Sequence, residues 1–179
     1  MGDNNGHGTH TLSTAGGTFV ANVSLFVHGN GTAKGGSPHA RVATYKVCWP
    51  ECYDADILVA FDAAIADGVH VLSVSLGGAL VDYFKDGLAI GSFHAVKNGI
   101  KVVCSTGNSD PTAGSVTNVA PWIFTVAAST MDREFPAYVS FGNTSIKGLS
   151  LSSASLAEGK YPIIRSTDAQ ADNSTQDDA

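Results

Sequence analysis

Apolar residues recur at helical spacing in two segments of the chain, which predicts two amphipathic helices. The first is expected from about Ala55 to Asp67, with Asp54 or Asp56 as its cap and Gly68 ending it. The second is expected over about residues 83–97, before an Asn-Gly pair that suits a helix end. The apolar positions of the first helix are Ile57, Leu58, Phe61, Ala64 and Ile65.

Short β-prone runs alternate with these helices. Four of them are expected to be strands: Val42–Val47, Val69–Leu76, Ile100–Ser105 and Ile123–Ala128. The alternation indicates an α/β fold with a mainly parallel sheet and right-handed crossovers. Ligands of such sheets bind at the carboxyl ends of the strands, which here are Ser75-Leu76-Gly77 and Ser105–Asn108.

The composition narrows the possible functions. Of the 179 residues, 44% are hydrophobic and 15% are charged, which is enough apolar material for a buried core. A net charge of −6 argues against a nucleic-acid partner. No apolar run is long enough to span a membrane, and Met1-Gly2-Asp3 does not begin a secretion signal. We therefore expect no membrane partner and no leader within this sequence.

The glycosylation motifs favour a secretory route, in which a disulfide between two of the three cysteines is plausible. Cys48 and Cys52 lie close enough for a small disulfide, with two free thiols as the alternative, and Cys104 lies in an apolar run typical of a core. Four N-x-S/T sequons are glycosylation candidates: Asn22, Asn30, Asn143 and Asn173.

The most distinctive motif is the segment Asn5–Thr11. His7 lies between two glycines at the start of an expected helix, where it is accessible and can serve as a general base. His7 and His10 are also spaced so that they could bind a metal, or they could be polar loop residues. The metal reading is weak because neither a Glu in the zinc-protease pattern nor a nearby Cys accompanies them.

The segment Gly6–Thr11 is similar to the histidine signature of subtilisin-like serine proteases. Other blocks agree with plant-type subtilases in order and spacing: Ala43–Trp49, Ser73–Gly78, Ser105–Ser109, Thr117–Trp122, Thr125–Thr130 and Asp132–Pro136. The chain therefore resembles this family over nearly its whole length. The resemblance implies an incomplete subtilisin-like three-layer α/β fold and an extracellular peptidase.

The resemblance also implies roles for particular residues. His7 would be the catalytic base, and Asn108 would donate its side-chain amide to the oxyanion; the two would face one cleft. Ser75, Leu76 and Gly77 would line that cleft and pair with an extended peptide substrate. For Ser75 and Leu76 a place in a buried strand is the alternative, and both roles can hold together. No cofactor and no metal are implied.

Two members of the catalytic triad are not found in this sequence. Asp3 is too near His7 to be the orienting carboxylate and is expected to be a solvated loop residue, and no Gly-Thr-Ser segment is present. Residues 1–146 would form a partial catalytic domain. Residues 147–179, with an expected strand at Tyr161–Ile164, would begin an inserted protease-associated domain.

Three functions remain to be compared. The first is a serine endopeptidase of which this chain is a piece that is inactive by itself. The second is a truncated pseudo-protease that binds peptides or proteins without hydrolysing them. The third is a nucleotide-binding domain, which is disfavoured because neither G-x-G-x-x-G nor a P-loop motif follows any expected strand.

Overall fold

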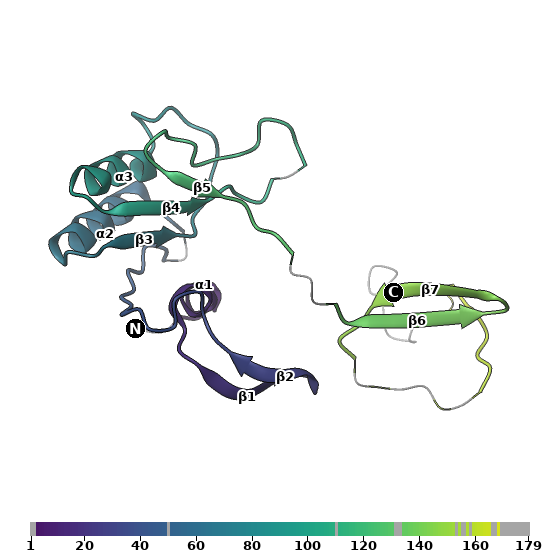
Figure 1. Cartoon of the computed structure of the whole chain (residues 1–179). Coiled ribbons are helices and arrows are strands. Elements are labelled where there is room, and N and C mark those ends of the chain that lie inside the picture. The colour runs from purple at the N-terminus through teal and green to yellow at the C-terminus, as the bar shows by residue number, and fades with distance from the viewer. Residues whose placement is uncertain are drawn as a thin grey trace.

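The computed structural model describes residues 3–49, 51–109, 111–130, 134–152, 154, 157, 159–165 and 168. Three helices and seven strands are assigned within these residues (Figure 1). In chain order they are α1 (His7–Gly16), β1 (Val20–Leu25), β2 (His28–Ala33), α2 (Asp54–Ala66), β3 (Val71–Val74), α3 (Gly87–Lys97), β4 (Lys101–Ser105), β5 (Phe124–Val126), β6 (Pro136–Phe141) and β7 (Thr144–Leu149).

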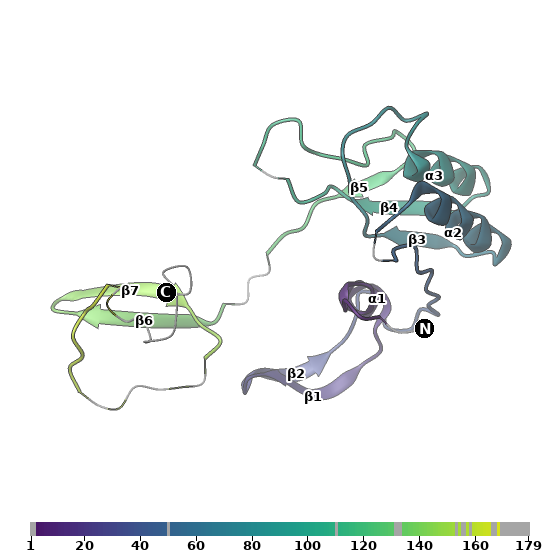
Figure 2. The same cartoon turned by 180° about the vertical axis from the view of Figure 1, so that it is seen from behind.

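A three-stranded parallel sheet, in the order β3-β4-β5, forms the centre of the fold. Val74 pairs with Cys104, and Ser105 pairs with Val126, so the carboxyl ends of the three strands lie along one edge. Helices α2 and α3 cover one face of this sheet, as Figures 1 and 2 show from opposite sides. The expected α/β class and parallel pairing are therefore confirmed for these strands.

The core lies between the two helices and the sheet. Side chains alternate along a strand, so Val102 and Cys104 point to the helix-covered face and are 0% and 2% exposed. The buried cluster comprises Ile57, Phe61, Leu88, Ala95, Ile100, Val102 and Cys104. On the opposite face the side chains of Val71, Phe124 and Val126 remain exposed.

Helices α2 and α3 approach closely where Phe61 faces Gly91. Phe61 is 5% exposed, and a Cβ added to Gly91 would lie 2.3 Å from its Cδ2 atom. The absence of a side chain at Gly91 therefore sets how near α3 can lie to α2. This contact fixes the position of α3 over β4, and so the position of the β4 end.

The helix ends follow the sequence only in part. Asp86 caps α3 by accepting a 2.9 Å hydrogen bond from the amide of Leu88. At α2 the expected cap was wrong: Tyr53 is the N-cap residue and makes no side-chain capping bond. The expected stop is confirmed, because Gly68 follows the helix at φ +68° and its amide donates to Ile65.

Two expected strands are absent from the described residues. Val42–Val47 runs without a ladder of hydrogen bonds, although Val47 packs on the core and the Tyr45 hydroxyl donates to Asp67 across 2.6 Å. Tyr161–Ile164 forms no strand either, and its apolar side chains are exposed. In both cases the β-prone composition is present but no neighbouring strand pairs with it.

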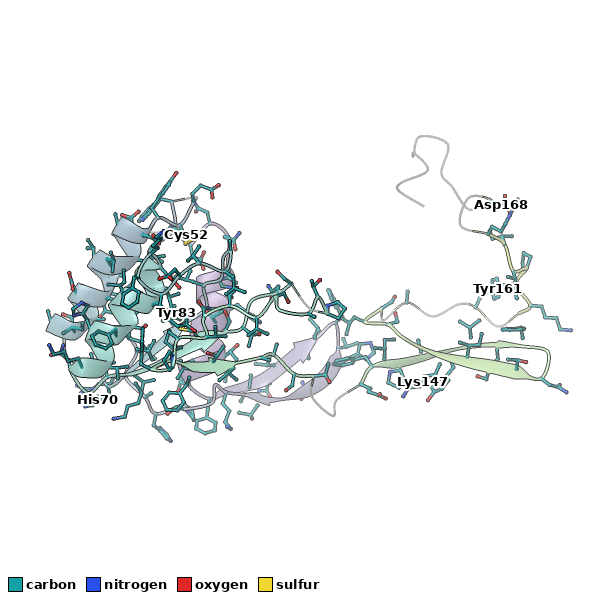
Figure 3. The ribbon with its side chains drawn as sticks, turned by 90° about the horizontal axis from the view of Figure 1, so that it is seen from above. Cys52, His70, Tyr83, Lys147, Tyr161 and Asp168 are labelled. Carbon is teal, nitrogen blue, oxygen red and sulfur yellow. A yellow bond between two sulfur atoms is a disulfide. The ribbon has the colours of Figure 1, made fainter. Side chains whose placement is uncertain are left out.

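Two antiparallel hairpins complete the described structure. The hairpin β1–β2 adjoins α1, and β6–β7 lies apart from the parallel sheet. Figure 3 shows Lys147, Tyr161 and Asp168 on the side away from Cys52, His70 and Tyr83. The boundary expected between residues 146 and 147 falls within β7, and the assignment of residues 147–179 to an insert stays a prediction.

Helix α1 depends on hydrogen bonds at its N-terminus, because none of its residues is buried. The carboxylate of Asp3 accepts bonds from the Thr9 amide (2.8 Å), the Thr9 hydroxyl (2.7 Å), the Gly6 amide (2.8 Å) and the Asn5 amide (3.2 Å). These bonds, led by those from Thr9, hold the pKa of Asp3 well below its usual range. Asp3 is exposed, as expected, but it also anchors the helix that carries His7.

The contact between Phe61 and Gly91 predicts that Gly91→Ala destabilises the chain. Alanine favours a helix over glycine by up to about 1 kcal/mol, whereas overpacking a core costs about 1–3 kcal/mol. Because the added Cβ would lie 2.3 Å from the buried Phe61 ring, the steric cost exceeds the gain in helix propensity. Urea denaturation is expected to show a net loss of about 1 kcal/mol, and adding Phe61→Leu should recover part of it. Unchanged or greater stability of Gly91→Ala would contradict the contact.

The Asp3 network predicts an acid-sensitive α1. Because the pKa of Asp3 is lower in the folded chain than in the unfolded chain, its contribution is complete above about pH 4 and falls as pH drops below that value. The protection of the Thr9 amide, measured as its exchange rate relative to that of an unstructured chain at the same pH, is expected to fall at low pH in the wild type. In Asp3→Ala this protection should be low throughout, whereas Asp62→Ala, on exposed α2 surface, should behave like the wild type. Equal exchange of Thr9 in all three would disprove the anchoring role.

Candidate active site

His7 and Ser75 meet although 68 positions separate them in the sequence. The Oγ atom of Ser75 lies 3.5 Å from Nε2 of His7. His7 is the first residue of α1, and Ser75 directly follows β3. The structure therefore brings His7, the predicted general base, against Ser75, one of the three predicted substrate-binding residues.

The ends of β3 and β4 lie against each other. A Cβ added to Gly77 would lie 3.5 Å from the Cα atom of Gly107, and the Ser105 hydroxyl donates to the Leu76 carbonyl across 3.2 Å. Gly107 adopts φ +85°, which turns the chain at the end of β4 and leads directly to Asn108. Asn108 is exposed, and no side-chain hydrogen bond is recorded for it within the described residues. The side-chain amide of Asn108 is thus available to a ligand.

The relation of Asn108 to His7 stays a prediction. Both residues belong to segments that contact the end of β3: His7 through Ser75, and Asn108 through its neighbour Gly107 against Gly77. Such contacts are consistent with one shared cleft at the carboxyl edge of the sheet.

A second asparagine, missed as a functional residue in the sequence, joins the two strand ends. The Nδ2 atom of Asn118 donates to the carbonyls of Leu76 and Ser105, both across 2.8 Å. Asn118 adopts φ +58°, which is uncommon for a residue with a side chain. The adjacent Thr117 is buried, and its amide donates to Thr106. The sequence gives only a weak signal for this role of Asn118. It is one asparagine within Thr117–Trp122, a block that resembles plant-type subtilases but in which the resemblance implies no functional residue.

A groove of about 270 Å³ borders the end of β3. Its walls include Leu76 and Gly77 on one side and Thr117, Asn118 and Val119 on the other. Tyr83, labelled in Figure 3, lines it as well; its hydroxyl donates to the Val119 carbonyl across 3.2 Å and its ring contacts Trp122 edge-on. Two of the three predicted substrate residues, Leu76 and Gly77, therefore border this groove, and Ser75 does not line it.

The cysteines are not nucleophiles in this arrangement. Cys48 and Cys52 are joined in a disulfide. Cys104 is buried in the core, where desolvation, with a smaller effect of the Asp86 charge, raises its pKa to about 12. A thiol with such a pKa is protonated at neutral pH, so it is neither reactive nor a metal ligand.

Three glycosylation candidates lie on the surface. Asn22 is exposed in β1 at φ +61°, Asn30 is exposed in β2, and Asn143 is exposed in the turn between β6 and β7. Exposure is what a glycosylation site requires. Asn173 lies outside the described residues.

The described part of the chain contains neither a candidate metal site nor a candidate membrane-spanning helix. No group of three or more His, Cys, Asp or Glu residues there is arranged to hold a metal ion. None of its helices combines the length and apolar character needed to cross a membrane.

Comparison with known proteins gives the same family over almost the whole sequence. Residues 1–177 match the subtilase family. Subtilisin-like protease SBT5.4 of Arabidopsis thaliana is 60% identical over 183 residues, and SBT5.3 of the same plant is 61% identical over 184. Subtilisin-like protease Glyma18g48580 of Glycine max is 52% identical over 183 residues.

The alignments differ greatly in the share of each protein that they cover. They include 99% of this chain for both Arabidopsis proteins and 97% for the Glycine protein, but only 24%, 24% and 23% of those relatives. The chain thus spans about a quarter of the length of the curated relatives it matches. Given the family match over residues 1–177, the chain belongs to the subtilase family.

Proposed function

We propose that this chain is part of a serine endopeptidase that cleaves peptide bonds through an acyl-enzyme. The observation that carries the proposal is the contact between His7 Nε2 and Ser75 Oγ, made by segments that match the subtilase family. In such a site His7 accepts the proton of the nucleophilic serine and later returns it to the leaving amine. The names of the relatives, all subtilisin-like proteases, support the same assignment.

The main chain after β3 suits the binding of an extended peptide. The Leu76 carbonyl accepts hydrogen bonds from Ser105 and Asn118, so it is directed toward β4 and is occupied. Main-chain groups alternate in direction along an extended strand, and those of Ser75 and Gly77 therefore point to the other side. There they can pair with a substrate that adds as a further strand. We therefore assign the binding of the substrate main chain to the main-chain groups of Ser75 and Gly77. The Leu76 carbonyl has a structural role instead, because it bonds to Ser105 and Asn118.

Asn108 is proposed to donate to the developing oxyanion. Its side chain is exposed and unbonded within the described residues, and it directly follows the sharp turn at Gly107. A donor directed at the position of the oxyanion stabilises the tetrahedral intermediate more than the substrate carbonyl, which is the condition for catalysis.

We further propose that the 179 residues are inactive when isolated. Ser75 contacts His7, but it belongs to the substrate strand, and no Gly-Thr-Ser nucleophile motif is present in this sequence. Without a nucleophile His7 has no proton to accept. The alternative, a pseudo-protease that binds peptides, uses the same groove and differs only in the absence of hydrolysis.

An extracellular, glycosylated protein is proposed on the basis of the sequons and the disulfide. Asn22, Asn30 and Asn143 are exposed, and Cys48 and Cys52 are bonded. Disulfides persist mainly in oxidising compartments, where N-glycosylation also takes place.

The isolated chain is predicted to neither hydrolyse a fluorogenic peptide nor react with a fluorophosphonate probe. His7→Ala and wild type should give the same background signal, because the chain lacks a serine in the nucleophile position. Hydrolysis or labelling that disappears in His7→Ala, but persists in His10→Ala on the same helix, would contradict the prediction and identify an overlooked nucleophile.

The catalytic role of His7 is tested in a complete protease. Residues 1–179 can replace the matching segment of SBT5.4, which is 60% identical. In this chimera His7→Ala is expected to lower kcat by at least about 10²–10⁴-fold, the usual contribution of a general base. His10→Ala is the matched control and should stay within about threefold of the parent. Equal activity of the chimera and its His7→Ala variant would refute the proposed function.

A further inference from the structure

We propose that Asn118 is a positioning residue that holds two segments at a fixed separation: the substrate strand, residues 75–77, and the oxyanion loop, residues 106–108. The inference rests on the proposed function, since it assigns those two roles to the ends of β3 and β4. It goes beyond the roles that the family resemblance implied, because Asn118 was not among those residues.

Both protons of the Asn118 side-chain amide are committed to the two strand ends. Nδ2 donates to the Leu76 carbonyl and to the Ser105 carbonyl, in each case across 2.8 Å. An amide nitrogen has two protons, so this nitrogen has no donor left for any other partner. Leu76 is the middle residue of the substrate strand, and Ser105 is the last residue of β4, three positions before Asn108.

The Leu76 carbonyl is the point at which the two segments are joined. It accepts one bond from Asn118 and a second from the Ser105 hydroxyl, across 3.2 Å. A carbonyl oxygen has two lone pairs, so both are in use. Register between β3 and β4 is recorded only as far as Val74 and Cys104. Beyond that pair, Asn118 and Ser105 continue the connection where the regular strand pairing has ended.

Asn118 is itself held in place from β5. The Thr125 hydroxyl donates to the Asn118 carbonyl across 2.5 Å, and Thr125 pairs with Cys104 in the sheet. The neighbouring Thr117 is buried and donates its amide to Thr106 across 3.0 Å. Because the main chain is held at both residues, the Asn118 amide is presented to the two strand ends from a fixed backbone.

The backbone at Asn118 adds a second indication of a specific role. A φ of +58° is disfavoured for residues with a Cβ, and glycine would adopt it more easily. Asparagine tolerates this region better than most residues and also supplies a short amide side chain. A glycine would relieve the backbone but lose both hydrogen bonds. Asparagine at this position therefore supplies two hydrogen bonds that glycine could not make.

The chain offers a matched control at Asn22, which adopts φ +61° in β1 and has no recorded side-chain hydrogen bond in the described structure. Asn118→Gly and Asn22→Gly relieve the same kind of backbone conformation. Only Asn118→Gly removes the link between the strand ends. A difference between the two variants therefore reports on the side-chain amide rather than on backbone strain.

The first test is amide hydrogen exchange in the 179-residue chain, followed by NMR. Asn118→Gly is expected to accelerate exchange in the paired strand ends beside this link, residues 73–74 of β3 and 103–105 of β4, by about 10- to 100-fold, the effect of losing two hydrogen bonds. Asn22→Gly should leave these amides within about twofold of wild type. Unchanged exchange in Asn118→Gly, or acceleration confined to residues 117–119, would overturn the proposal.

A second variant keeps this test decisive if Asn118→Gly does not fold. Thr125→Val is close in volume and removes the hydroxyl that fixes the Asn118 carbonyl, while both amide bonds can still form. It is expected to accelerate exchange at the same two places by about threefold to tenfold. Exchange at these places that matches wild type would count against the proposal.

The kinetic test uses the SBT5.4 chimera and separates the two proposals. A positioning residue affects the transition state more than substrate binding, so Asn118→Gly should lower kcat about 10- to 100-fold and change KM less than about threefold. Wild-type kcat in this variant, with His7→Ala inactive, would overturn the role of Asn118 and leave the proposed function intact. Hydrolysis that does not depend on His7 would instead refute the proposed function, while the exchange result still decides whether Asn118 couples the strand ends.

Discussion

The parallel pairing of β3 with β4 is the constraint on which the site depends. Parallel strands present their carboxyl ends at one edge, so a residue that follows β3 and a residue that follows β4 are neighbours although about 30 positions separate them. The pairing is held from the helix side by Val102 and Cys104, which are almost fully buried. Burial of such side chains contributes about 1.5–3 kcal/mol each. The core of α2, α3 and β4 therefore determines where the polar groups at the edge lie.

The sequence was sufficient where hydrophobic burial decides the structure. Three of the five predicted apolar positions of α2, Ile57, Phe61 and Ala64, are buried, and the other two are half-buried. Strand β4 lies where an apolar run predicted it. The sequence was insufficient where structure depends on a partner strand. Val42–Val47 and Tyr161–Ile164 have suitable side chains, but a strand requires hydrogen bonds from a neighbour, which is a property of the whole fold and not of the segment.

The site residues divide in the same way. His7, Ser75 and Asn108 could be selected because their motifs are distinctive, and the structure brings His7 to Ser75. Asn118 could not be selected by the same reasoning, because its role arises from a backbone at φ +58° and from two carbonyls distant in sequence. The role of Asp3 was missed for a related reason. Its place beside His7 excludes it from the triad, but its carboxylate accepts hydrogen bonds from the free amides at the start of α1.

The two sides of the site are stabilised by different forces. The strand ends belong to a packed sheet, but α1 has no buried residue and is held by hydrogen bonds at both ends. Asp3 accepts at its N-terminus, and the amides of Gly36 and Ser37 donate to Thr14 and Ala15 near its C-terminus across 2.9 Å each. Exposed hydrogen bonds contribute little net free energy, so local opening of α1 should cost less than opening of the sheet. His7 therefore lies on α1, the less stable of the two elements that meet at the site. Its distance from Ser75 should change more readily than any distance within the sheet, above all at acid pH, where Asp3 becomes protonated.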